Sequence, residues 1–498
     1  MTNALDSFTT SLTYLHPCYN PVLLTQICHA LVLCYGLKSP EKAAVYQNMV
    51  MATTLRHQTL NRSSKKIRKG KDKQIKDGKD DEDELLKLLD STRLDKDERK
   101  GVNQMLHLQT IKNTVGFRTS AGDISESFKN TIELLPEDLT VCTLSIVQAP
   151  DRENMKHLVI TRLRKNNESL FLIITLPNEE EEADCMEQEF QTNDSVVRDL
   201  SSIFRRSILS DFAAIMRELN ESIKIKSKRE WWSRREQVDN QLERFVQRME
   251  ETWFGRWRGI LSGRRLDETD CSRLHSYVER TQEMAVEILG RRIQNEQLLE
   301  VLTDSFCHLQ PNEVMKALTE LTGMRANCKQ LIKFSKALSN FLDDNESVDN
   351  AIGVKRGPVV LILDKSIQHL PFEAMPILRD QQVSRMPSLE FINAYLSLQK
   401  ITKSRVDTRQ TFYVLNPQDN LPNTEKKFSD WFLSEKGWKG VVGRAPSAEE
   451  FKEALANHQL FIYMGHGNGR EFLKGDEITR LYCQAVALIM GCSSGKLI

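Results

Sequence analysis

Two reactive side chains follow apolar runs close to the end of the chain. His466 comes after the run 460–464, and Cys492 comes after the run 485–490, with one glycine before each reactive residue. A short, continuous apolar run bounded by glycine is typical of a buried strand. The carboxyl ends of parallel strands meet at one rim of an open α/β sheet. We therefore expect His466 and Cys492 to face each other there as base and nucleophile.

This pair of residue types fits a cysteine protease. Such an enzyme needs a thiolate, a base that generates it and later protonates the leaving amine, and donors for the oxyanion. His466 is suited to the roles of base and acid. The backbone N–H groups of Gly467 and Cys492 are the natural oxyanion donors, because Gly467 has no side chain to block the approach of substrate. An imidazolium beside Cys492 would lower the pKa of its thiol and favour the thiolate.

Other interpretations of the same residues stay open at this point. A cysteine after an apolar strand is most often a small core residue, and a single histidine often has only a structural role. The segment Gly491–Lys496 resembles the end of a phosphate-binding loop. However, one residue is missing between its glycines, and Leu497 stands where a magnesium-binding Ser or Thr belongs. No cofactor is predicted.

Composition excludes several classes of function. The chain has 498 residues, a formal net charge of zero and 28% charged residues, so no global field directs it to nucleic acid or membrane. No apolar run approaches the roughly 18 residues of a membrane span, and the N-terminus lacks the pattern of a secretory leader. The ten cysteines are scattered without metal-ligand spacing, which indicates reduced intracellular thiols and no metal site.

The first half of the chain divides by composition. Residues 1–60 have helical spacing and predict a short N-terminal helical segment. Residues 61–104 pass from a basic run to an acidic one with few large apolar side chains, which predicts a disordered, charged linker. The basic run is also compatible with a nuclear-import or nucleic-acid patch. Strand candidates follow within 138–176, as a meander or the start of an α/β layer.

Residues 187–345 carry helical stripes and predict a helical insert, with its last two helices near 271–304 and 310–345. The start of one stripe holds Trp231-Trp232 beside Arg234-Arg235. Tryptophan interleaved with arginine can stack on nucleic-acid bases. At helical spacing it more often marks large core residues with solvated charges beside them, and we favour the core interpretation.

From residue 351 strands and helices alternate. Strand patterns at 359–363, 411–415, 440–442 and the two terminal runs are separated by helical patterns. This alternation predicts an α/β fold with a mostly parallel sheet flanked by helices.

Several of these stretches together resemble the separase family, cysteine endopeptidases of the caspase-like clan. The strongest match is YMGHGNGREFL at 463–473 with LYCQAVALIMGCSSG at 481–495. Further matching segments lie at 359–364, 370–376, 385–388, 415–417, 424–425 and 440–446, and in the tryptophan-rich stretches 231–235 and 253–259. The resemblance covers about 135–498 and implies a caspase-like protease domain at 351–498. It also implies a substrate-binding, pseudo-protease-like region at 105–350.

The resemblance implies roles and partners. His466 would be the general base and acid, Cys492 the nucleophile, and Gly467 with Cys492 the oxyanion hole, without a third triad member. Separases cleave the kleisin subunit of cohesin after arginine in a Glu-x-x-Arg context and so release sister chromatids at anaphase. A securin inhibits them as a pseudosubstrate. The expected location is the cytoplasm, with access to the nucleus and chromosomes in mitosis.

Two departures from the family pattern give further expectations. The family has a long N-terminal helical-repeat region, and most of it would here either come from a separate chain or be absent. The chain ends six residues after Cys492, so the acidic residue of the arginine-binding S1 pocket would lie beyond it. The alternative function is therefore an interaction scaffold with an incomplete, inactive protease fold that binds securin and a helical partner.

Overall fold

The structure is a computed structural model that describes residues 7–12, 20–74, 96–115, 121–148, 155–167, 169–176, 208–402 and 406–491. The chain forms two compact units. Unit 1 consists of residues 1–69 and 110–396, and unit 2 of residues 70–109 and 397–498. No helix in these described stretches is both long and apolar enough to cross a membrane.

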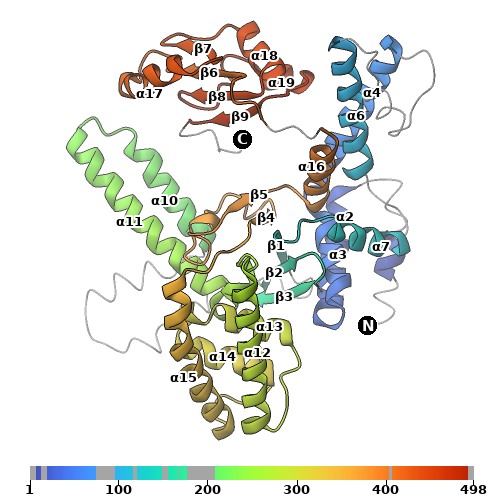
Figure 1. Cartoon of the computed structure of the whole chain (residues 1–498), viewed down its shortest axis with the longest axis vertical. Helices are drawn as coiled ribbons and strands as arrows, with labels where there is room; N and C mark the ends of the chain where they lie inside the picture. Colours follow the sequence, from blue (N-terminus) through green and yellow to red (C-terminus); the bar gives the residue numbers. More distant parts are fainter. Residues whose placement is uncertain are drawn as a thin grey trace. The chain divides into compact units, whose positions relative to one another are not determined.

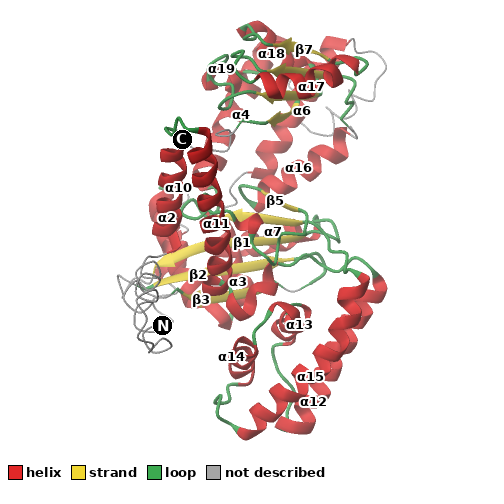
Figure 2. Cartoon of the chain, turned by 90° about the vertical axis from the view of Figure 1, so that its left-hand side faces the viewer, coloured by secondary structure: helices red, strands yellow, loops and turns green. Residues whose placement is uncertain are grey.

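Unit 1 is built on a five-stranded sheet in the order β3-β2-β1-β4-β5 (Figure 2). The strands are β1 (Thr140–Gln148), β2 (Lys156–Leu163), β3 (Leu170–Thr175), β4 (Val359–Leu363) and β5 (Val383–Arg385). The first three form an antiparallel meander, whereas β4 runs parallel to β1 and to β5. The three strand predictions within 138–176 are confirmed.

The N-terminal helices cover one face of this sheet. Helices α2 (Pro21–Tyr35) and α3 (Pro40–Val50) share a buried apolar cluster with Val147, Val159 and Phe171 of the sheet. The fully buried Gln47 donates from its amide nitrogen to the carbonyl of Val159 over 2.9 Å. The same face is covered further along by α7 (Ala121–Glu133) and α16 (Leu389–Thr402).

The helical insert covers the opposite face, because side chains alternate along each strand. Cys142 and Leu144 of β1 belong to the large core that the insert helices complete. The helices are α10 (Ile208–Ser222), α11 (Lys228–Trp253), α12 (Glu268–Leu289), α13 (Glu296–Asp304), α14 (Pro311–Thr322) and α15 (Lys329–Ile352). The short 3₁₀ helices of the chain are η1 (Gly36–Lys38), η2 (Gly255–Leu261), η3 (Phe306–His308) and η4 (Phe372–Ala374).

The two helices predicted at 271–304 and 310–345 are each divided in the structure. Gly290 ends α12 and Gly323 ends α14, both with the left-handed backbone that glycine adopts without steric cost. The predicted part of the insert at 187–207 lies outside the described residues.

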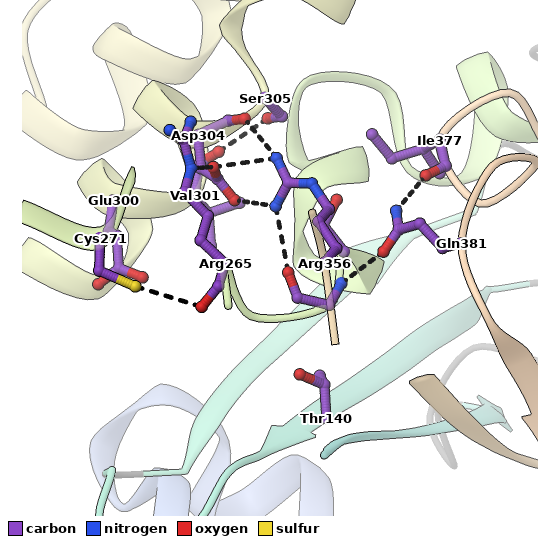
Figure 3. A network of polar contacts seen from close by, with 12 residues as sticks. Thr140, Arg265, Cys271, Glu300, Val301, Asp304, Ser305, Arg356, Ile377 and Gln381 are labelled. Atoms are coloured by element: carbon purple, nitrogen blue, oxygen red, sulfur yellow. Dashed lines mark hydrogen bonds and ion pairs between the residues drawn. The ribbon is translucent and has the colours of Figure 1, made fainter. Parts of the chain in front are cut away.

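A buried ion-pair network joins the insert to the sheet (Figure 3). The guanidinium of Arg356, just before β4, donates to both carboxylate oxygens of Asp304 at 2.7 and 3.0 Å. Arg265 donates to the same carboxylate over 2.7 Å. Burial alone would raise the pKa of the Asp304 carboxyl, but the charges and hydrogen bonds of the two arginines outweigh it and hold that pKa well below its usual value.

Unit 2 holds a four-stranded sheet in the order β7-β6-β8-β9, with every pair parallel. Its strands are β6 (Thr411–Leu415), β7 (Lys439–Val442), β8 (Leu460–Met464) and β9 (Val486–Ile489). Helix α17 (Pro422–Ser434) packs on one face, and α18 (Ala448–Asn457) on the other with α19 (Gly475–Arg480). The alternation predicted for this part of the chain is confirmed. The prediction of a buried strand at 485–490 is wrong, because β9 is the edge strand of this sheet and all four of its residues are exposed.

The charged stretch predicted as a disordered linker over 61–104 is partly helical. Helix α4 (Thr53–Gln74) continues into its basic run, and α6 (Lys96–Val115) begins before its end. A composition that cannot form a core does not prevent helix formation, because lysine, arginine and glutamate are good helix formers. The rest of the predicted linker, 75–95, lies outside the described residues.

The predicted domain boundary at 350/351 falls within unit 1, in which β4 pairs with β1. The four-domain division by sequence stays a prediction.

We expect Asp304→Asn to lower the free energy of unfolding by about 3–5 kcal/mol, because it leaves two buried guanidinium groups without a carboxylate. Urea unfolding at neutral pH measures this loss. The exposed Asp343→Asn is the control, with an expected change of about 0.5 kcal/mol or less.

The pH dependence of this stabilisation has a defined sign. Because the folded pKa of Asp304 is lowered, the contribution is complete above the ordinary aspartate pKa of about 3.9 and is lost as the pH falls toward the folded pKa. The difference between wild type and Asp304→Asn should therefore shrink in acid. A difference that is small at neutral pH and grows in acid would contradict this account.

Candidate active site

The two terminal strands predicted to carry the reactive residues lie side by side in unit 2. Strands β8 and β9 are parallel neighbours, with Tyr463 opposite Ile489. The offset in this register is 489 − 463 = 26 residues. The spacing between His466 and Cys492 is also 492 − 466 = 26 residues. His466 and Cys492 therefore lie the same number of residues beyond a directly paired position of β8 and β9, respectively.

His466 sits in an exposed turn directly after β8. The buried phenol of Tyr463 donates a hydrogen bond of 2.7 Å to the backbone carbonyl of His466. Burial raises the pKa of Tyr463 to about 12, so this donor keeps its proton at neutral pH. Gly467 then has φ of +64°, which a residue with a side chain rarely adopts. Tyr463 and Gly467 together fix how the backbone around His466 turns.

Gly491 lies directly against this turn. A Cβ atom added to Gly491 would lie 1.8 Å from the carbonyl oxygen of Gly467 and 3.1 Å from that of Gly465. Only glycine permits such an approach of two backbones. Met490, just before it, donates its N–H to the carbonyl of Tyr463 over 2.8 Å, which continues the strand pairing beyond β9.

Among the predicted site residues, the structure describes His466 and Gly467. It brings their turn into contact with Gly491. Cys492, the predicted nucleophile and second oxyanion donor, lies outside the described residues, so its predicted role stays a prediction.

The loop after β6 adds residues that were not assigned a function from the sequence. Asn416 donates its backbone N–H to the carbonyl of Met464 over 2.9 Å and adopts a positive φ of 52°, which asparagine tolerates better than most residues. Its side-chain amide donates to Glu425 over 2.6 Å, and its amide oxygen accepts from the N–H of Leu421 at 2.8 Å. Asn416 therefore ties the end of β8 to the start of α17.

Helix α6 contributes a second unpredicted contact within unit 2. The hydroxyl of Tyr482, four residues before β9, is hydrogen-bonded to Nδ1 of His107, and the two rings lie 5.8 Å apart. Burial lowers the pKa of His107 and raises that of Tyr482 to about 12. The pair of neutral rings anchors the segment that leads into β9. Residues so far apart in sequence give no local pattern from which to predict the contact.

The described cysteines include two that burial makes unsuitable as nucleophiles. Burial raises the pKa of Cys28 to about 12 and that of Cys142 to about 11, so both stay thiols at neutral pH. Within the described part of the chain, no group of three or more His, Cys, Asp or Glu side chains has the arrangement of a metal site.

Known proteins match this chain along most of its length. The family model of the separin protease domain matches residues 153–498. Separin of Mus musculus is 29% identical over 516 residues, which cover 99% of this chain and 22% of that protein. Separin of Emericella nidulans is 29% identical over 405 residues, covering 76% of this chain and 19% of that protein. The chain thus spans about a fifth of the length of these curated relatives.

Solved structures match the fold. A crystal structure of the Saccharomyces cerevisiae separase–securin complex aligns with a TM-score of 0.54 and 16% identity, covering 99% of this chain and 39% of that chain. A second crystal structure of that complex aligns with a TM-score of 0.51 and 16% identity, over 92% of this chain and 29% of that one. At this identity the likeness concerns the fold, an α/β arrangement of parallel-rich sheets flanked by helices.

We expect Gly491→Ala to disrupt the β8–β9 rim, because the new methyl group would collide with the carbonyl oxygen of Gly467. The expected loss of stability is about 1–3 kcal/mol, measured by urea unfolding, with faster hydrogen exchange at the Met490 amide. Gly475→Ala is the matched control, since its methyl would meet only the mobile guanidinium of Arg470 at 3.3 Å. Equal behaviour of the two variants would contradict the close approach.

We expect His107→Gln to flatten the pH dependence of stability between pH values of about 7.5 and 5.5. Burial lowers the folded pKa of His107, so its stabilising contribution is complete above the ordinary value of about 6.5 and is lost as the pH falls from there toward the folded pKa. Unfolding free energies of wild type and variant across this range measure the effect. Tyr482→Phe should instead cost about 0.5–1.5 kcal/mol nearly equally at each pH. An unchanged slope in His107→Gln would refute a neutral, buried His107.

Proposed function

This chain belongs to the separin family, and we propose that it is a cysteine endopeptidase in which Cys492 is the nucleophile and His466 the general base and acid. One observation carries the assignment. The register of β8 and β9 has the same offset of 26 residues as His466 and Cys492, and Gly491 contacts the turn that holds His466. Cys492 directly follows Gly491 in the sequence.

The first chemical step forms the acyl-enzyme. His466 takes the proton of the Cys492 thiol, and the sulfur attacks the carbonyl carbon of the scissile peptide bond. The electron pair of the carbonyl moves onto its oxygen, where the N–H groups of Gly467 and Cys492 donate hydrogen bonds. When the tetrahedral intermediate collapses, the C–N bond breaks and His466 protonates the leaving amine.

The second step restores the enzyme. His466 removes a proton from water, whose oxygen attacks the thioester carbon. The C–S bond then breaks, the carboxylic acid leaves, and the thiolate recovers its proton. The exposed position of His466 suits this role, since the imidazole must reach both the thiol and incoming water.

For the substrate we propose the kleisin subunit of cohesin, cleaved after arginine in a Glu-x-x-Arg context to release sister chromatids at anaphase. Family membership supports this proposal. The complex of securin with the Saccharomyces cerevisiae separase supports a securin as inhibitory partner of this chain. The proposed location is the cytoplasm, with access to chromosomes in mitosis.

We expect Cys492→Ser and His466→Ala each to lower kcat/KM for a kleisin fragment by at least about 10³-fold, with little further loss in the double variant, because the two residues act as a unit. The assay uses the full-length protein. Cys483→Ser, at an exposed cysteine, is the matched control and should keep its activity.

A peptide with an arginine-directed electrophile should label Cys492 covalently. Undiminished cleavage by Cys492→Ser, or labelling of another cysteine, would overturn the assignment. Securin binding without any cleavage would support the scaffold alternative instead.

A further inference from the structure

Helices α10 and α11 form a long hairpin whose two halves differ in packing (Figure 1). Near its base, the tilted rings of Phe212 and Phe245 lie 5.4 Å apart, centre to centre, within the main core of unit 1. Arg248 forms an ion pair with Asp211 there. From residue 213 to 237, by contrast, Ser222 is the one buried residue among those described. The outer half of the hairpin therefore holds no core of its own.

The hairpin end, residues 221–237, exposes large apolar side chains. Ile223 is 71% exposed and the indole of Trp232 is 59% exposed. The core interpretation of the tryptophan stripe is confirmed at Trp253 and Trp257, which are 4% and 2% exposed, but it is wrong at Trp232. The reason is that the stripe extends along α11 beyond the point where the rest of unit 1 covers it.

Four cations lie between these apolar residues in the sequence: Lys224, Lys226, Lys228 and Arg229. All four are exposed, and none forms a hydrogen bond or ion pair through its side chain with any described residue. Arg234 differs, since it pairs with Glu218 at 3.2 Å. The hairpin end contains six basic and three acidic residues, in a chain whose formal net charge is zero.

A hollow of about 570 Å³ lies at the hairpin end, with Arg229 as the one member of the four cations in its lining. It is lined by Ile225, Ser227, Arg229, Glu230, Ser233, Arg234 and Gln237. This volume falls within the range of pockets that hold a side chain or a small ligand. An aliphatic side chain and two guanidinium groups thus share one concave surface.

We propose that the hairpin end is a docking surface for an acidic peptide segment that carries a large apolar side chain. The apolar side chain packs on Trp232 and Ile223, and the flanking carboxylates pair with the lysines. Charge complementarity of this kind sets partner choice and association rate, and aromatic and arginine residues are the usual anchors of such surfaces. This inference concerns binding and goes beyond the proposed catalytic function.

A peptide fits this surface better than single-stranded nucleic acid. Binding of single strands uses several aromatic faces in succession. Here Trp231 is partly buried, and the guanidinium of Arg235 lies 5.5 Å from the centre of its ring.

The test measures the anisotropy of a short fluorescein-labelled peptide of alternating glutamate and phenylalanine. The titrated protein is the full chain carrying Cys492→Ser. We expect saturable binding that weakens with salt, and at least about tenfold weaker binding to Trp232→Ser. Lys224→Glu/Lys226→Glu/Lys228→Glu should weaken binding as much. The assay measures binding and not cleavage. A lack of peptide binding would therefore contradict the docking proposal without contradicting the proposed protease function.

Matched controls separate this surface from general electrostatics. Lys329→Glu/Lys333→Glu/Lys336→Glu changes the net charge equally on exposed positions of α15, and Trp431→Ser removes a half-exposed indole from unit 2. Both should bind the peptide like the parent protein. A matched peptide of glutamate and serine should bind at least about tenfold more weakly.

Several outcomes would overturn the proposal. These are absence of peptide binding at low salt, equal weakening by the α15 variant, and tighter binding of an oligothymidine to the same residues. Loss of self-association in the hairpin variants without any effect on the peptide would assign the surface to a second copy of the chain.

Discussion

The register between β8 and β9 is the constraint on which the candidate site depends. Parallel pairing fixes which residues leave the two strands at the same height, and a shift by one residue would turn each side chain to the other face. With Tyr463 opposite Ile489, His466 and Cys492 are equally far beyond the paired residues. The glycine at 491 then lets the two backbones approach to a distance that no side chain would allow. The register thus sets which residues follow the two strands at equal distance, and Gly491 allows the two backbones to approach there.

A second constraint keeps the insert in place. Asp304 ends α13. Of the two arginines that neutralise it, Arg356 lies on the connection from α15 to β4, and Arg265 lies on the connection from η2 to α12 within the insert. Arg356 also donates to the carbonyl of Gly263, whose N–H donates in turn to Gln381. A buried charge of this kind adds little net stability compared with an apolar core, but removing one partner is costly. The main effect of the network is therefore to favour one arrangement of these connections, and its net contribution to the free energy of unfolding is small.

The sequence predicted the elements whose pattern is local. The strands at 359–363, 411–415 and 460–464 were predictable because each is a continuous apolar run, as buried parallel strands require. The breaks at Gly290 and Gly323 were not, since a glycine inside a helical pattern is compatible with both continuation and capping. The charged helices α4 and α6 were missed because composition reports on core formation and not on helix propensity.

The candidate site was predictable only where its residues belong to a local sequence pattern. Glycines beside His466 and Cys492 mark the ends of their strands, so the pair could be named from the chain alone. The contact of Tyr482 with His107 joins positions 375 residues apart, and no pattern within either segment points to the other. At Trp232 a local pattern exists but predicts burial wrongly. Helical spacing predicts an apolar face of the helix without indicating how far the rest of the protein covers that face.

Unit 1 also shows that the part of the chain that folds together is longer than the part that defines the family. The family match begins at residue 153, whereas β1 ends at Gln148. Yet β1 lies between β2 and β4 and pairs with both, antiparallel on one side and parallel on the other. Without it, two buried strands would each present an unpaired edge. The buried amide of Gln47 adds a hydrogen bond from still earlier in the chain to the carbonyl of Val159 in β2. The sheet that supports the insert therefore needs residues before the family match to satisfy its own backbone.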